Sequence, residues 1–199
     1  MNIYLIGMMG TGKSMIGELL TEKLDYPFVD LDEKIEKYSE KSITEIFEKD
    51  GEENFRNLES EQLRYYFNSV IACGGGIILK EENRTFMKEN GKVVLLTASI
   101  PELSKRLIKS NSRPLLVEEN KEELLTKFWS ERRLHYLSTA DYTIETGHKT
   151  KEEIAEEIIG EELSEEKRKQ FILKIVKYAK EKGLITNKEI VKDIGFFDF

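Results

Sequence analysis

The amino-acid sequence predicts an α/β protein of three layers (α/β/α), with a five-stranded parallel sheet between helices, followed by a C-terminal helical appendage. Short aliphatic and β-branched runs alternate along the chain with longer stretches of helical periodicity, as in proteins built from strand–helix–strand units. Several of the helical stretches begin with a capping signal. Beyond Gly160 the alternation ends and only helical patterns remain, which predicts the appendage.

The predicted strands are short runs rich in aliphatic residues. They are Asn2 to Ile6, Pro27 to Asp30, Val70 to Cys73, Val93 to Thr97 and Tyr142 to Glu145. The first lies in the opening MNIYLIGMMG, which is apolar but short and leads directly into a glycine-rich loop. We therefore interpret it as a buried strand and not as a secretion signal, which would have a cationic start and a cleavage site.

Capping boxes mark three helix starts, because a Ser or Thr and a Glu three residues later can each bind the other's backbone N–H. These pairs are Ser42 with Glu45, Ser99 with Glu102, and Thr150 with Glu153. Gly91 and Gly160 stand where helices are expected to end. Arg113-Pro114 is followed by the aperiodic segment LLVEENKE, Leu115 to Glu122, which predicts an exposed flexible loop between helices.

These patterns predict a main domain over residues 1–160 and a helical extension over residues 161–199. One helix of the extension is expected from about Ser164 to Gly183. Its apolar stripe consists of Phe171, Ile172, Ile175, Val176 and Ala179. A second helix is expected from Thr186. We favour a helical hairpin packed on the main domain over a separate interaction module.

The composition bounds what the chain can bind. Its 199 residues are 39% hydrophobic and 35% charged, which suits one globular domain with a small appendage. The formal net charge of -7 and the pI near 5.2 argue against general binding of nucleic acid or anionic membrane. Cys73 is the single cysteine, so no intrachain disulfide can form. Because the sequence also has no long apolar run, we expect a cytoplasmic protein. We expect separately that it is a monomer.

The segment Gly7 to Ser14, GMMGTGKS, fits the P-loop pattern G-x-x-x-x-G-K-[ST]. A predicted strand precedes it and a helical pattern follows it, which is the context that a P-loop needs. Its glycines allow backbone N–H groups to turn toward phosphates, and the following helix adds its positive N-terminal end. Lys13 would contact the β- and γ-phosphates, and the Ser14 hydroxyl would be a ligand of Mg²⁺. The motif predicts binding of a nucleoside triphosphate.

A second candidate site follows the second strand, in Phe28-Val29-Asp30-Leu31-Asp32. Ligands of open parallel sheets collect at the carboxyl ends of the strands, so Asp30 and Asp32 are candidates for contact with a substrate. One alternative stays open from these residues alone. Asp32 could simply cap the N-terminus of the helix that follows it.

Several further motifs accompany these two. They are Asp50 to Arg56, DGEENFR, before a helix that carries Glu59; VIACGGGIIL at Val70 to Leu79; Arg113-Pro114-Leu115-Leu116; Arg132 and Tyr136 in SERRLHY; and Ala140-Asp141. Taken in order from about Asn2 to Gly160, the set resembles the shikimate kinases. The resemblance implies a P-loop kinase fold and ATP-dependent phosphorylation of the shikimate 3-hydroxyl group, with ATP and Mg²⁺ as cofactors.

The resemblance also implies a role for each matching position. The nucleotide would be bound by Met9, Gly10, Thr11, Gly12, Lys13, Ser14, Arg106 at the adenine, and Arg113 from a lid over about residues 109–121. Mg²⁺ would be held by Ser14 and, through water, by Asp30. Shikimate would be bound by Asp32, Arg56, Gly74, Gly75, Gly76 and Arg132. Lys13, Asp32 and Arg113 would be catalytic, with Asp32 as the candidate base. Phe47 and Phe55 would form an apolar wall under the ring, or be plain core residues.

Some features depart from the family pattern or leave a choice. Many members carry Ser or Thr just before the glycine triplet, whereas this chain has Ala72-Cys73. Arg133 follows Arg132, and we favour Arg132 because it lies one helical turn before Tyr136. The competing enzymes are gluconate kinase and nucleoside monophosphate kinase. A non-catalytic nucleotide-binding regulatory module is the competitor from another class.

Overall fold

The computed structural model describes residues 1–109 and 121–160. The chain divides into two units, Met1–Ala155 and Glu156–Phe199, and the fold and the site below belong to the first. Residues 110–120 of the predicted lid, including Arg113, and the predicted extension 161–199 lie outside the described residues. The domain boundary at residue 160 stays a prediction.

The described strands form one parallel sheet in the order β2-β3-β1-β4-β5. They are β1 (Asn2–Ile6), β2 (Phe28–Asp30), β3 (Val70–Ala72), β4 (Gly91–Thr97) and β5 (Tyr142–Glu145). In register, Ala72 near the end of β3 lies opposite both Leu5 of β1 and Asp30 of β2. The segments that leave β1, β2 and β3 therefore start side by side at one edge of the sheet.

Helices connect these strands. They are α1 (Lys13–Leu24), α2 (Leu31–Ser39), α3 (Ile43–Lys49), α4 (Gly51–Leu63), the short 3₁₀ helix η1 (Ile77–Leu79), α5 (Glu81–Asn90), α6 (Ile100–Lys109) and α7 (Lys121–Thr139). A further helix covers residues 151–160. No described helix has both the length and the apolar character that a membrane span requires.

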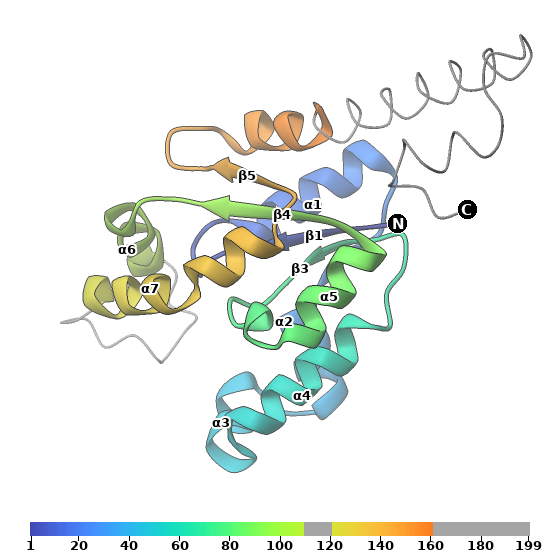
Figure 1. Cartoon of the computed structure of the whole chain (residues 1–199), viewed down its shortest axis with the longest axis vertical. Helices are drawn as coiled ribbons and strands as arrows, with labels where there is room; N and C mark the ends of the chain where they lie inside the picture. Colours follow the sequence, from blue (N-terminus) through green and yellow to red (C-terminus); the bar gives the residue numbers. More distant parts are fainter. Residues whose placement is uncertain (110–120, 161–199) are drawn as a thin grey trace, which may run out of the picture. The chain divides into compact units, whose positions relative to one another are not determined.

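The direction of each crossover places the helices in two layers. From β1 to β2 the chain moves toward one edge of the sheet, and from β3 to β4 it moves the opposite way. Because such crossovers are right-handed, α1 and α5 must cover opposite faces. Figure 1 shows α1 on one side of the strands and α5 and α7 on the other. The predicted three-layer α/β fold with a five-stranded parallel sheet is confirmed.

The strand boundaries differ from the expected ones by at most two residues. The clearest difference is in β4, which begins at Gly91 instead of Val93. Gly91 also follows the last residue of α5, as its expected role at a helix end requires. A Cβ there would overlap the carbonyl of Asn2 on β1. Close approach of two backbones therefore explains this glycine.

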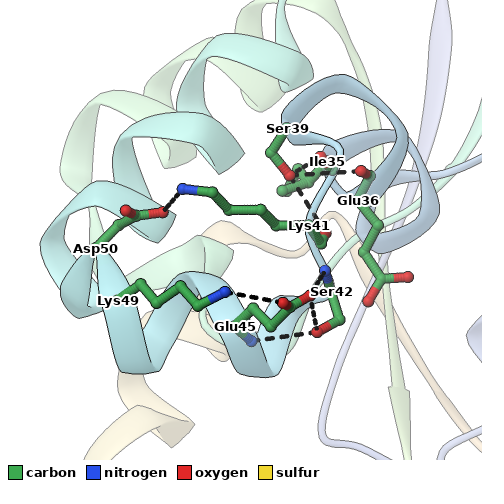
Figure 2. A network of polar contacts seen from close by, with 8 residues as sticks. All are labelled: Ile35, Glu36, Ser39, Lys41, Ser42, Glu45, Lys49 and Asp50. Atoms are coloured by element: carbon green, nitrogen blue, oxygen red, sulfur yellow. Dashed lines mark hydrogen bonds and ion pairs between the residues drawn. The ribbon is translucent and has the colours of Figure 1, made fainter.

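The capping boxes at Ser42 and Thr150 form as predicted. The Ser42 hydroxyl accepts from the Glu45 N–H at 3.2 Å, and the Glu45 carboxylate accepts from the Ser42 N–H at 3.0 Å. Figure 2 shows this pair beside an ion pair between Lys41 and Asp50, whose charged atoms lie 2.6 Å apart. Since Asp50 immediately precedes α4, the network ties the start of α3 to the start of α4.

The core of the described residues forms around the sheet. Every residue of β1 is buried, and β4 is buried along most of its length. Buried aliphatic side chains from the helices complete it, among them Ile16, Leu20, Ile35, Leu63 and Leu125. Burial of each such side chain stabilises the fold by about 1.5–3 kcal/mol. This core holds the loops at the carboxyl edge of the sheet in place.

Candidate active site

The loop between β1 and α1 forms a phosphate cradle. Gly12 precedes the first residue of α1 and has φ +91°, which favours glycine. No side chain caps the N-terminus of α1, so its first N–H groups and the positive end of its dipole face the loop. Gly7 shows a second constraint, since a Cβ there would overlap the carbonyl of Leu96.

Side chains of the loop also bind the loop itself. The Lys13 ammonium donates to the carbonyls of Gly7 and Met8, at 3.0 Å each. The Thr11 hydroxyl donates to the Met8 carbonyl at 2.8 Å and is buried. The Thr11 backbone N–H donates to the same carbonyl at 3.4 Å, so Thr11 shapes the loop through both groups.

Ser14 and Asp30 meet at the floor of the site. The Ser14 hydroxyl donates to Asp30 Oδ2 at 2.5 Å. The other oxygen of Asp30 accepts from the backbone N–H of Asp32 at 3.1 Å, so Asp30 is the N-cap of α2. The open alternative that Asp32 caps this helix is therefore wrong: Asp32 lies inside the first turn. The Asp32 side chain lines a cavity beside the P-loop.

A cavity of about 280 Å³ lies between these groups. Its lining comprises Met9, Gly10, Gly12, Lys13, Ser14, Met15, Asp30, Asp32, Ala72, Cys73, Gly74 and Gly75. The structure thus brings together the predicted P-loop, the acidic pair and two of the three glycines. Burial raises the pKa of the Cys73 thiol, and only 2% of this residue is exposed. Cys73 is therefore a neutral wall of the cavity.

The glycine triplet leaves room for charged side chains. A Cβ on Gly74 would lie 2.5 Å from Glu59 Oε1 and 2.9 Å from Asp32 Oδ1, and one on Gly76 would overlap the Arg56 guanidinium. At Gly75 the nearest atoms would be 3.6 Å away, which is ordinary contact. None of the three has a φ in the left-handed region. Close packing therefore explains Gly74 and Gly76, and the backbone conformation requires glycine at none of the three positions.

Arg56 is held between two carboxylates of its own helix, α4. Its Nη1 donates to Glu59 Oε2 at 2.6 Å, and its Nη2 donates to Glu52 Oε1 at 2.8 Å. The Glu59 side chain is buried, and its Oε1 has no hydrogen-bond partner in the described part of the chain. Burial raises the pKa of Glu59 to about 7, although the positive charge of Arg56 acts in the opposite direction.

Arg132 and Arg133 differ in their surroundings. Arg132 Nη1 donates to the Gly75 carbonyl at 3.4 Å, and its guanidinium stacks on the Phe128 ring, 4.3 Å from the centroid. Arg133 is exposed. The Tyr136 hydroxyl, one turn further along α7, donates to the same Gly75 carbonyl at 2.5 Å. The geometry thus favours Arg132 for contact with a ligand at the triplet.

The remaining predicted residues lie around this centre. The rings of Phe47 and Phe55 pack with their centroids 4.8 Å apart, where α3 meets α4. Arg106 of α6 donates to the Gly10 carbonyl of the P-loop at 3.3 Å and to the Thr146 carbonyl at 2.8 Å. A second cavity of about 560 Å³ lies beside Arg106. Arg106 therefore joins the outer side of the P-loop to the segment after β5.

Sequence reasoning left Glu59 out of the site residues. The spacing could have indicated an ion pair, because Glu59 lies three residues after Arg56 on a predicted helix and side chains at this spacing are neighbours. That the carboxylate is buried, beside Gly74 and Asp32, follows only from the packing of α4 against the loop after β3.

The fold and the site define the class of protein. The site combines a P-loop after β1, an acidic pair at the end of β2, and two arginines, from α4 and α7, beside the glycine triplet after β3. This is the arrangement of a P-loop kinase that phosphorylates a small molecule. Comparison with known proteins narrows this class. A family model described as shikimate kinase matches residues 9–163. The chain belongs to the shikimate kinase family.

Individual relatives agree with this membership. The shikimate kinase of Thermodesulfovibrio yellowstonii is 43% identical over 163 residues, which are 80% of this chain and 94% of the relative. The solved shikimate kinase of Acinetobacter baumannii, in complex with shikimate, is 38% identical with a TM-score of 0.78, covering 82% of this chain and 93% of that one. A gluconokinase from Sinorhizobium meliloti shares the fold, with 22% identity and a TM-score of 0.55 over 85% of this chain and 96% of that one.

Proposed function

We propose that this chain transfers the γ-phosphoryl group of ATP to the 3-hydroxyl group of shikimate. Membership of the shikimate kinase family supports the reaction. The observation that carries the proposal is the convergence of Asp32, Arg56 and Arg132 on the glycine triplet, beside the P-loop cavity. A carboxylate and two guanidinium groups match an acceptor that has hydroxyl groups and a carboxylate.

Each side chain has a stated task in this proposal. Arg56 and Arg132 bind the carboxylate of the acceptor, because a planar guanidinium can donate two parallel hydrogen bonds to it. Asp32 accepts a hydrogen bond from the attacking hydroxyl, orients it and receives its proton. Phosphoryl transfer passes through a loose transition state, so alignment of this hydroxyl with the phosphorus matters more than the strength of the base.

The phosphate groups of ATP lie in the cradle formed by Met9, Gly10, Thr11, Gly12 and Lys13. Bound phosphate would attract the Lys13 ammonium away from the carbonyls of Gly7 and Met8, which it now contacts. Arg106 lies against adenine from the outer side of the loop. Arg113 contacts the phosphates when the lid closes, and exclusion of water then protects the phosphoryl group from hydrolysis.

The residues present also fit Mg²⁺. Ser14 and Asp30 place two oxygen atoms 2.5 Å apart beside the cavity. Mg²⁺ in kinases takes one or two protein oxygens together with waters and phosphates. Ser14 would bind the ion directly and Asp30 through water. When bound, Mg²⁺ neutralises charge on the phosphates. We also propose that the protein acts as a monomer.

An ADP-release assay tests the proposal. Purified protein is incubated with ATP and Mg²⁺ and with shikimate, gluconate, AMP or no acceptor. We expect rapid ADP release with shikimate only, and shikimate 3-phosphate as the second product by mass spectrometry. Equal release without shikimate would overturn the proposal, and release with gluconate or AMP alone would favour the corresponding related kinase.

A further inference from the structure

We propose that Tyr136 is a positioning residue for the acceptor: its hydroxyl fixes the Gly75 carbonyl and thereby sets both the glycine triplet and Arg132. This inference rests on the proposed function, since it concerns the site at which shikimate would bind. The carbonyl oxygen of Gly75 accepts two hydrogen bonds: one from the Tyr136 hydroxyl at 2.5 Å and one from Arg132 Nη1 at 3.4 Å.

The Tyr136 hydroxyl is built to donate at this place. The side chain is completely buried, and its ring packs on Trp129 with the centroids 6.1 Å apart. Burial raises the pKa of Tyr136 to about 12, so the hydroxyl keeps its proton throughout the working pH range. A buried hydroxyl needs a partner, and the Gly75 carbonyl supplies it. The position of α7 therefore determines the position of this carbonyl.

Fixing the carbonyl also orients the peptide group that follows it. The described residues contain no cis peptide bond, and in a trans peptide the C=O and N–H groups point in opposite directions. Since the Gly75 carbonyl faces α7, the N–H of Gly76 faces away from α7. Gly76 is the residue that packs against the Arg56 guanidinium. The orientation of the triplet backbone therefore affects the atoms that contact Arg56 and Arg132.

Arg132 depends on the same carbonyl. One of its nitrogens donates to the Gly75 oxygen, while stacking on Phe128 restricts the plane of its guanidinium. Without the Tyr136 hydroxyl, the carbonyl would retain only this longer hydrogen bond. Both the triplet and the guanidinium would then gain freedom in the part of the site that binds the acceptor. The Lys13 and Ser14 contacts of the P-loop do not involve this carbonyl.

The test is the Tyr136→Phe variant, which removes one hydroxyl and keeps the ring. Loss of a hydrogen bond of ordinary strength corresponds to roughly a three- to tenfold effect. We expect the KM for shikimate to rise by about this factor, while the KM for ATP changes less than about twofold. Tyr4→Phe is the matched control. Tyr4 is also completely buried, and its oxygen accepts from the Asn2 amide at 2.8 Å, away from the site. We expect Tyr4→Phe to lower Tm and to leave both KM values unchanged.

A double-mutant cycle with Arg132→Ala separates positioning from a purely structural role. If Tyr136 acts through Arg132 and the triplet, its effect on the KM for shikimate will be smaller in the Arg132→Ala background than in the wild type. An unchanged KM for shikimate in Tyr136→Phe would overturn the inference, and so would equal rises in both KM values. Because the wild type is assayed beside the variants, a wild-type protein that phosphorylates shikimate preserves the proposed function even when this inference fails.

Discussion

Arg56 and Glu59 form a buried ion pair directly behind the glycine triplet, with 2.6 Å between Nη1 and Oε2. The exposed fraction of the Glu59 side chain is 1%, whereas Arg56 keeps 14%. Glu59 therefore supports the guanidinium from within the protein, while the exposed Glu52 binds its other side.

Replacement of Arg56 should weaken binding of the acceptor and spare the nucleotide. Arg56→Ala removes a charge-assisted contact to the shikimate carboxylate, so we expect the KM for shikimate to rise about 10- to 100-fold. The KM for ATP should stay within about twofold of the wild-type value, because Arg56 does not line the P-loop cavity. Arg64→Ala, at the C-cap of the same helix and outside the site, is the control. Equal losses for both substrates would show that Arg56 does not bind the carboxylate.

Glu59 should make stability depend on pH. Its pKa is raised from 4.5 to about 7 by burial, so between these values the folded chain holds a proton that the unfolded chain releases. This contribution to stability is complete below about pH 4.5 and is lost as the pH rises through about 7. Glu59→Gln should therefore flatten the decrease in the free energy of unfolding over this range. Denaturant titrations at several pH values measure the free energy of unfolding. Glu53→Gln, at an exposed position, is the control. Parallel pH profiles for wild type and Glu59→Gln would contradict the prediction.

Gly76 and Gly75 should respond differently to an added methyl group. Gly76→Ala displaces the Arg56 guanidinium, while the Cβ of Gly75→Ala makes only ordinary contacts. Because the displaced group is the end of a side chain, both variants should fold. We expect Gly76→Ala to raise the KM for shikimate by about tenfold or more, and Gly75→Ala to have a smaller effect. Steady-state kinetics measure the KM for shikimate, and Tm measurements check that both variants are folded. A larger rise in this KM for Gly75→Ala than for Gly76→Ala would contradict the prediction.

The neighbours Arg132 and Arg133 offer a matched pair of variants. Arg132 contacts the Gly75 carbonyl, whereas Arg133 points to solvent. Arg132→Ala should therefore raise the KM for shikimate about 10- to 100-fold, and Arg133→Ala should leave it unchanged. Calorimetric titration with shikimate gives the same comparison without turnover. A loss of shikimate binding in Arg133→Ala would instead assign the carboxylate contact to Arg133.

Ser14 should govern the response to Mg²⁺. Ser14→Ala removes one of the two oxygen atoms beside the cavity, so more Mg²⁺ should be required for half-maximal activity. The activity is measured over a range of Mg²⁺ concentrations at fixed ATP and shikimate. Ser39→Ala removes a hydroxyl that binds within α2, away from the site, and serves as the control. Identical Mg²⁺ curves for Ser14→Ala and wild type would exclude Ser14 as a ligand.

The amino-acid sequence alone predicted the sheet, the P-loop and most helix starts. These features depend on interactions between residues close in sequence: a capping box needs two side chains three residues apart, and a buried strand needs one apolar run. The cap of α2 was left open at this level, since Asp30 and Asp32 are both suitable and only the chain direction after β2 decides between them.

Tertiary packing decided how the site is assembled. Arg56, Gly74 and Arg132 come from three separate segments, and their proximity depends on how α4 and α7 pack beside the end of β3. The glycine triplet illustrates the difference. Its sequence indicates that bare backbone is needed, but only the fold reveals that Gly74 and Gly76 leave space for the protein's own carboxylates and guanidinium. Such contacts between distant residues have no periodicity or spacing in the sequence, so they emerge only when the chain is folded.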